Sequence, residues 1–160
     1  MTPRERASIM VVVLSLGATV AFAQDEPSAP RLLTGGTRAT FRSVSMTSMS
    51  DPVTIEITSG GSFDVRSLET APSCRGSVML RPDAIVRLTD PPPSMRIAVR
   101  AAGDTTLVVH TPDDRWLCDD DSGGGVNPAL LVEHPLEGQY DVWVGSYRAD
   151  QAIHGRLTIE

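Results

Sequence analysis

The chain has 160 residues, of which 14 are basic and 20 are acidic, and its formal net charge is −6 at pH 7. This length suits one domain with a single hydrophobic core rather than two. The acidic excess argues against nucleic acids and anionic membranes as partners, because both would be repelled. Cations or neutral ligands are therefore the expected partners, such as an extracellular protein or polysaccharide. We also expect a monomer.

Residues 1–23 have the pattern of a cleavable secretory signal. Two arginines precede an apolar run over residues 9–20, and the sequence AFA follows it at residues 21–23. A membrane anchor is the alternative, but a helix needs about 20 apolar residues to cross a hydrocarbon core. We expect cleavage before Gln24 and export to the periplasm or the medium, with no membrane attachment afterwards. The exported chain then keeps 12 basic and 19 acidic residues, a net charge of −7.

The exported chain begins with a lead-in over residues 24–50, rich in Ser, Thr, Gly, Pro and Met. Because it shows little periodicity, we expect it to be flexible, with at most one strand near residues 39–44. From residue 51 to residue 160, apolar and polar residues alternate as in half-buried strands. We expect strands at residues 53–57, 77–80, 84–88, 95–99, 105–110, 115–118, 129–133, 139–144 and 153–159. Turn residues separate them about every ten positions, which predicts an all-β domain built as an antiparallel β-sandwich.

Cys74 and Cys118 are the only two cysteines. In the oxidising compartment that the signal implies, we expect one disulfide between them. Closing a loop of this length contributes about 4 kcal/mol in the chain-entropy model. Two unpaired thiols are the alternative, and a zinc site is disfavoured because the cysteines lack paired metal-ligand spacing.

Three aromatic residues are candidate ligand-binding positions: Trp116, Trp143 and Tyr147. Trp143 is out of phase with the row that Tyr140 begins, so it faces away from the core if that row faces inward. An exposed indole can stack on a sugar ring or a peptide side chain. The alternative is that this tryptophan packs against a covering segment of the chain.

A serine hydrolase needs a nucleophile, a base in hydrogen-bonding reach and a third group that orients the base. The chain has no Gly-x-Ser-x-Gly motif, and Ser146 stands at a predicted strand end. His110, His134 and His154 lie on or beside predicted strands and are more simply surface residues. The sequence therefore predicts no catalytic residues, and we expect no enzyme activity.

The strongest chemical signal is a cluster of side-chain oxygens. The candidate calcium ligands are Asp113, Asp114, Asp119, Asp120, Asp121 and Asn127. Calcium takes six to eight oxygen ligands on an adaptable loop, and three consecutive glycines at residues 123–125 make this segment adaptable. The spacing is not that of an EF-hand. The alternative is that these acids cap turns and remain in water.

Several motifs resemble the bacterial pre-peptidase C-terminal domain group, in particular its secreted stand-alone members. They are DTTLVV, PD, W, CDD, NP and GQYDVWVGSY over residues 104–147, with DP, SGG, CRG and PD upstream. The resemblance covers about residues 51–160. It implies a jelly-roll β-sandwich that usually accompanies secreted proteases, sometimes binds calcium and in some relatives binds protein or polysaccharide. The chain departs from the group at Asp114, where glycine is more usual.

Together these features favour a secreted, non-catalytic module that binds an extracellular ligand or accompanies an exported enzyme, with calcium as its candidate cofactor. A serine peptidase, by family association only, and a structural envelope protein are the alternatives. A peptidase requires a nucleophile, a base and oxyanion donors that converge in one pocket. A binding module requires only an exposed face.

The calcium hypothesis predicts that the melting temperature rises with calcium and falls with a chelator. Binding to the folded state alone adds about 2.7 kcal/mol when the ion is at a hundred times its Kd. Replacing Asp119 and Asp121 with Asn should abolish this shift. If sodium chloride of equal ionic strength moves the midpoint as far as calcium does, only screening is at work and the site is absent.

Overall fold

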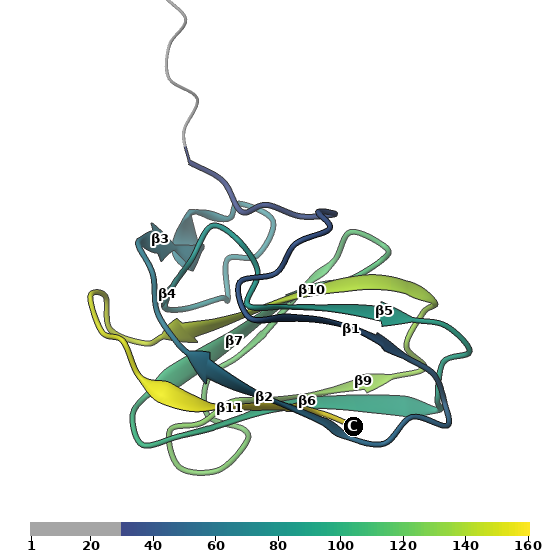
Figure 1. The fold of residues 1–160 in the computed structure, drawn as a ribbon. Coiled ribbons are helices and arrows are strands. Elements are labelled where there is room, and N and C mark those ends of the chain that lie inside the picture. Colours follow the sequence, from purple (N-terminus) through teal and green to yellow (C-terminus); the bar gives the residue numbers. More distant parts are fainter. Residues whose placement is uncertain (1–29) are drawn as a thin grey trace, which may run out of the picture.

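The computed structural model describes residues 30–160, which form two β-sheets packed face to face (Figure 1). This confirms the all-β sandwich that strand alternation predicts. The signal peptide predicted at residues 1–23 lies outside the described residues. Within residues 30–160, no helix is long and apolar enough to cross a membrane.

The larger sheet has seven strands and is organised around β10. Its members are β1 (Arg42–Met46), β3 (Phe63–Asp64), β4 (Ser77–Val78), β5 (Ala84–Leu88), β7 (Thr105–His110), β8 (Trp116–Asp119) and β10 (Gly138–Ser146). Strand β10 pairs with β5, β4 and β7, and β7 in turn pairs with β8. The outer neighbours are β1 beside β5 and β3 beside β4.

The smaller sheet is antiparallel throughout, in the order β2-β11-β6-β9. Its strands are β2 (Val53–Thr58), β6 (Ser94–Ala101), β9 (Ala129–Glu133) and β11 (His154–Ile159). The predicted bounds of β5, β7 and β9 agree with the structure, and the other predicted strands differ at one or both ends. Alternation is a strong signal here because one side chain in two faces the opposite sheet.

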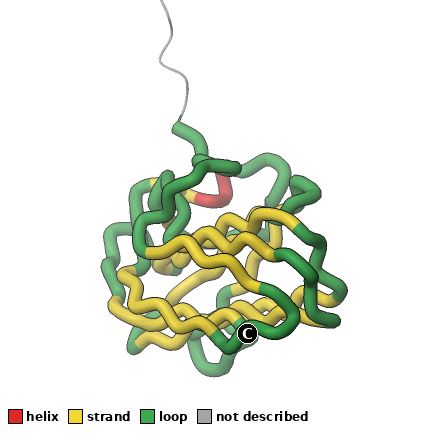
Figure 2. Tube along the Cα trace, turned by 45° about the vertical axis from the view of Figure 1, so that its right-hand side comes forward, coloured by secondary structure: helices red, strands yellow, loops and turns green. Residues whose placement is uncertain are grey.

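The main core lies between the two sheets. Its fully buried members include Ala84, Val86, Ile97, Leu107, Val109, Val142, Val144, Leu157 and Ile159. A second apolar cluster lies on the outer face of the larger sheet, and Trp143 and Val108 point into it. The segment that runs from β3 to Cys74, together with Leu32, covers this second cluster. Figure 2 shows that covering layer, which contains the helical turn η1 (Val65–Ser67), drawn in red.

The segment before β2 departs from the prediction. Strand β1 runs parallel to β5, because the chain crosses to the smaller sheet after β1 instead of turning back on itself. Leu32 is buried in the second apolar cluster, and the Gly35 N–H donates to Asp141 Oδ2 at 2.7 Å. Residues 32–46 are therefore part of the folded domain, and the prediction of a flexible lead-in is wrong for them.

The edge of β10 has a gap at Val144, which lies between the parts of the strand that pair with β5 and β4. The side chain of Asp83 fills half of this gap, because its Oδ2 accepts the Val144 N–H at 2.7 Å. The Gly60 N–H fills the other half by donating to the Val144 carbonyl at 3.1 Å. A carboxyl group and a loop amide therefore take the place of a neighbouring strand.

This arrangement requires glycine at two positions. Gly60 has a φ of 100° and Gly61 a φ of 154°, within the range that side chains rarely adopt. A Cβ on Gly60 would collide with the Gln151 carbonyl, and one on Gly61 with the backbone at Val78. The loop can approach β10 and β4 this closely only without side chains.

Asp83 gives the fold a pH dependence. Burial raises the pKa of Asp83 to about 7 from 3.8, although the hydrogen bond from the Val144 N–H lowers it. The folded state therefore keeps a proton between about pH 4 and 7 that the unfolded chain releases. The free energy of unfolding should fall as the pH rises through this window, by up to about 1.4 kcal/mol per pH unit, and then level off.

Replacing Asp83 with Asn should flatten this part of the profile, because the amide has no titrating proton but can still accept the Val144 N–H. Urea unfolding between pH 5 and pH 8 measures the effect. Asp51→Asn is the matched control, because Asp51 is exposed. Equal slopes for the wild type and the Asp83 variant would show that Asp83 is already ionised in the folded protein at pH 5.

Candidate functional site

Residues 59–76, here named the cap, cover the outer face of the larger sheet. Phe63, Val65 and Cys74 of the cap pack in the second apolar cluster with Trp143. The predicted disulfide between Cys74 and Cys118 is present, with a Cα–Cα separation of 5.3 Å. It ties the end of the cap to β8, so the cap is held both by apolar contacts and by a covalent bond.

The three candidate aromatic residues have different surroundings. Trp143 is completely buried, so its proposed role in ligand binding is wrong and the packing alternative holds. Trp116 is partly buried between His110 and Trp143, with ring centroids 4.6 Å and 5.6 Å away. Tyr147 is 45% exposed and follows the end of β10 directly. Of the three, Tyr147 has the most accessible ring.

Tyr147 lines a hollow of about 260 Å³ between the cap and the turn that follows β10. We name this hollow the arginine pocket. Its lining residues are Ser62, Asp64, Arg66, Arg75, Gly76, Ser77, Tyr147 and Ala149. They come from three parts of the chain: the β3–η1 region, the residues just after the disulfide, and the β10–β11 turn. Two arginines thus line one hollow in a chain with an acidic excess.

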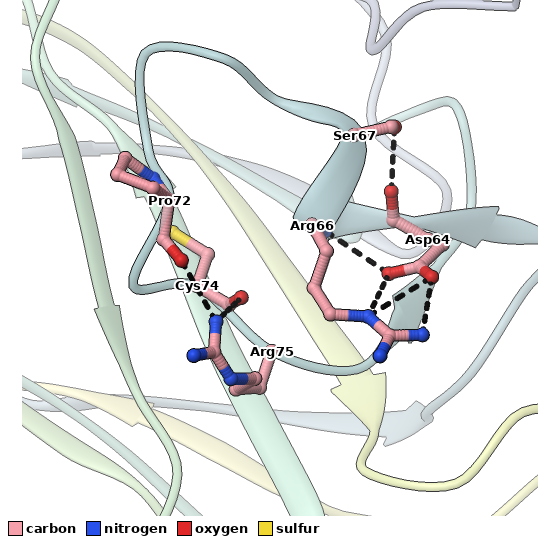
Figure 3. Close-up of polar contacts among 6 residues, drawn as sticks. All are labelled: Asp64, Arg66, Ser67, Pro72, Cys74 and Arg75. Atoms are coloured by element: carbon pink, nitrogen blue, oxygen red, sulfur yellow. Dashed lines mark hydrogen bonds and ion pairs between the residues drawn. The ribbon is translucent and has the colours of Figure 1, made fainter.

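The first arginine is held by its neighbour at the start of η1. The Asp64 carboxylate caps the turn by accepting the Arg66 N–H at 3.0 Å, and its Oδ2 accepts from Arg66 Nη2 at 2.7 Å. These bonds from Arg66 hold the pKa of Asp64 below its usual value. The Nε of Arg66 also donates to Asp64, which leaves Nη1 without a bond to this carboxylate (Figure 3).

The second arginine is held by the backbone beside the disulfide. Arg75 Nη1 donates to the carbonyls of Pro72 and Cys74, each at 2.8 Å (Figure 3). Its Nε and Nη2 have no hydrogen-bond partner among residues 30–160. A guanidinium with two free N–H directions can bind a carboxylate, sulfate or phosphate group through paired bonds, and such groups are called oxyanions below.

No sequence pattern indicates this pocket. Asp64, Arg66 and Arg75 belong to a stretch without periodicity, and nothing in their spacing indicates that they meet. The one available signal was the position of Arg75 directly after Cys74, because a disulfide fixes the residues beside it. Tyr147, which also lines the pocket, lies about seventy residues after Arg75 in the sequence.

The six calcium candidates are divided between the two ends of β8. Asp113 accepts from Thr111 Oγ1 and pairs with Arg115 at 2.6 Å in the β7–β8 turn. Asn127, beyond the other end, accepts the Ala101 N–H at 2.8 Å. Within residues 30–160, no group of three or more His, Cys, Asp or Glu side chains is arranged to hold a metal ion. Calcium binding stays a prediction from the sequence.

Another acid, Asp104, lies near this segment and is not indicated by the sequence pattern. Burial raises the pKa of Asp104, and the nearby carboxylates of Asp121 and Asp120 raise it further. Asp104 lies in the β6–β7 turn, and Asp120 and Asp121 lie in the loop that follows β8. The three carboxylates therefore come from two loops and repel one another. Any calcium titration should therefore include an Asp104 variant.

Ser146 and the three histidines do not form a catalytic arrangement in the described part of the chain. Ser146 is completely buried, and its Oγ has no hydrogen-bond partner. The His154 Nδ1 instead shares a hydrogen bond with Thr58 Oγ1 at 3.0 Å, and His110 Nε2 lies 3.5 Å from Asp114. The serine hydroxyl is therefore not placed to attack a substrate from solvent.

Comparisons with protein-family models, curated proteins and solved structures gave no match. The resemblance to the pre-peptidase C-terminal domain group therefore stays a prediction. At Asp114, where the chain departs from the group, the backbone has a φ of 59°, in the left-handed region. Glycine, the more usual residue of the group at this position, adopts that conformation without steric cost.

Asp119 has a structural role that can be measured. Its carboxylate accepts from the Ser122 N–H at 3.0 Å, from Ser122 Oγ at 2.6 Å and from the Ala129 N–H at 2.8 Å. Asp119→Ala should therefore lower the free energy of unfolding by about 2 kcal/mol with or without calcium, because hydrogen bonds to charged groups are worth about 1.5–3 kcal/mol. Asp120→Ala is the control, and urea unfolding with chelator present is the measurement. Equal stability of the two variants would contradict this role.

Proposed function

We propose that the chain is an exported, non-catalytic binding module that holds an oxyanion group of its ligand in the arginine pocket. The observation that carries this proposal is the meeting of Arg66, Arg75 and Tyr147 around one hollow. Each guanidinium is already fixed by bonds to the protein and keeps N–H groups for a ligand. Fixed donors bind more tightly than mobile ones because less side-chain entropy is lost on binding.

The pocket also offers contacts for the uncharged parts of a ligand. The Tyr147 ring provides an apolar face at low entropic cost, and Ser62 can bond to hydroxyl groups. This combination suits a small polar molecule or one unit of a polymer. The predicted peptidase alternative gains no support, because Ser146 has no contact with solvent.

Export is the second part of the proposal. The disulfide between Cys74 and Cys118 is compatible with an oxidising compartment, where such bonds form and persist. The arginine pocket lies directly beside this bond, since Arg75 follows Cys74 and bonds to its carbonyl. The binding geometry that we propose therefore depends on an environment in which the disulfide stays closed.

Titration with sodium glucuronate and sodium sulfate at constant ionic strength tests the pocket. The backbone amide resonances of Arg66, Arg75 and Tyr147 should shift and saturate, as should the Nε–H resonances of the two arginines. Arg75→Ala should weaken binding at least tenfold. Arg42→Ala is the control, because Arg42 is exposed and does not line the pocket. Shifts that match those caused by sodium chloride, or a loss of binding in the control alone, would overturn the proposal.

A further inference from the structure

A second pair of arginines lies on the outer face of the smaller sheet. Arg100 of β6 and Arg156 of β11 are direct cross-strand neighbours. Like charges directly opposite each other destabilise a sheet, so this pair is unfavourable unless an anion lies between the two groups. We name Arg100 and Arg156 the arginine pair.

The arginine pair is poorly neutralised by the protein itself. Arg156 Nε lies 3.9 Å from Glu56, both side chains being largely exposed, which makes this a weak contact. Arg100 has no ion pair among the described residues. Arg96, on the same strand and the same face, differs because Glu160 neutralises it at 3.0 Å. The uncompensated charge is therefore local to the arginine pair.

The arginine pair borders a shallow hollow of about 400 Å³. The other lining residues are Glu56, Ala101, Ala102, His154 and Gly155. The lining is polar apart from small residues, so it offers no place for a large apolar side chain. The hollow can hold an oxyanion between the guanidinium groups, while Glu56 accepts from a hydroxyl group.

Two short segments join this hollow to the arginine pocket. Thr58 bonds to His154 beside the arginine pair, and Ser62 lines the arginine pocket. Four residues span at most about 14 Å, which limits the separation of these two points. The other connection runs from Ala149 to His154. Figure 1 shows β3, β4, the β10–β11 turn and the start of β11 at the same end of the sandwich.

We propose that both hollows bind one acidic polysaccharide, which places one oxyanion in the arginine pocket and another at the arginine pair. This inference rests on the proposed function and names its ligand class. A polysaccharide is favoured over an acidic peptide because both linings combine guanidinium groups with side chains that can bond to hydroxyl groups, Ser62 in one and Glu56 in the other, and lack aliphatic pockets. The Tyr147 ring supplies the flat apolar surface on which a sugar ring stacks.

Two linked sites give the polymer an advantage over its monomer. After the first oxyanion binds, the second is held nearby at a millimolar effective concentration, and the combined affinity exceeds either single affinity by 10²–10⁴-fold. A chain too short to reach both sites gains nothing. Affinity should therefore rise abruptly with chain length rather than in proportion to charge.

The experiment is a calorimetric titration of the domain, with its disulfide intact, against galacturonate and galacturonate oligomers up to the decamer at constant ionic strength. The longer oligomers should bind about 100-fold more tightly than the monomer. Arg75→Ala and Arg100→Ala should each remove most of this gain. Arg96→Ala, on the same face as the arginine pair, should keep it. Melting temperatures of all variants check that the fold is unchanged.

The outcomes separate the two proposals. If Arg75→Ala alone weakens binding and chain length has no effect, the arginine pocket stands and the two-site polymer is overturned. If only Arg100→Ala matters, the arginine pocket and the bridging inference both fail. Polyglutamate that binds as tightly as the galacturonate oligomers would overturn the polysaccharide class. Neutral dextran should not bind, and binding of dextran would overturn the role of the oxyanions.

Discussion

The central strand of the larger sheet has one residue, Val144, whose backbone groups face a gap between neighbouring strands. An unpaired backbone group inside a protein costs about as much as a lost hydrogen bond, so the gap must be filled. Asp83 and Gly60 fill it from two distant parts of the chain. The bond from the Gly60 N–H to the Val144 carbonyl fixes the loop between β2 and β3, where the chain passes from the smaller sheet to the larger one. The position of the cap follows from it.

The cap accounts for the contrast between the overall charge and the candidate site. The acidic excess favours cations or neutral ligands at a distance, but electrostatic interactions in salt are screened within about 8–10 Å. At contact distance the charges nearest the ligand determine whether it is attracted. Asp64 pairs with Arg66 and therefore neutralises only part of the combined charge of Arg66 and Arg75. A ligand held by fixed guanidinium groups can therefore carry the same sign of charge as the protein as a whole. Overall charge was a poor guide to this site.

Sequence patterns predicted the sandwich because each strand alternates independently of the others. They could not predict the cap, whose covering role depends on contacts with Trp143 and on the bond to Cys118, both distant in sequence. Asp83 was equally hidden, because an aspartate after proline is typical of a turn and nothing local indicates complete burial. The phase of Trp143 along its strand correctly predicts that it lies on the outer face of the sheet, but it cannot indicate that the cap covers that face.

The strand order of the two sheets also bears on the order in which the protein can assemble. Strand β10 joins β5, β4 and β7, and β11 pairs with both β2 and β6. The last quarter of the sequence thus supplies β10, the central strand of the larger sheet, and β11, one of the two inner strands of the smaller sheet, while several of their partners come much earlier. Folds dominated by such distant pairings form slowly, because large loops must close before their contacts are made. During synthesis, which starts at the amino end, the larger sheet therefore lacks its central strand, and β2 lacks its partner β11, until the last quarter of the chain has been made.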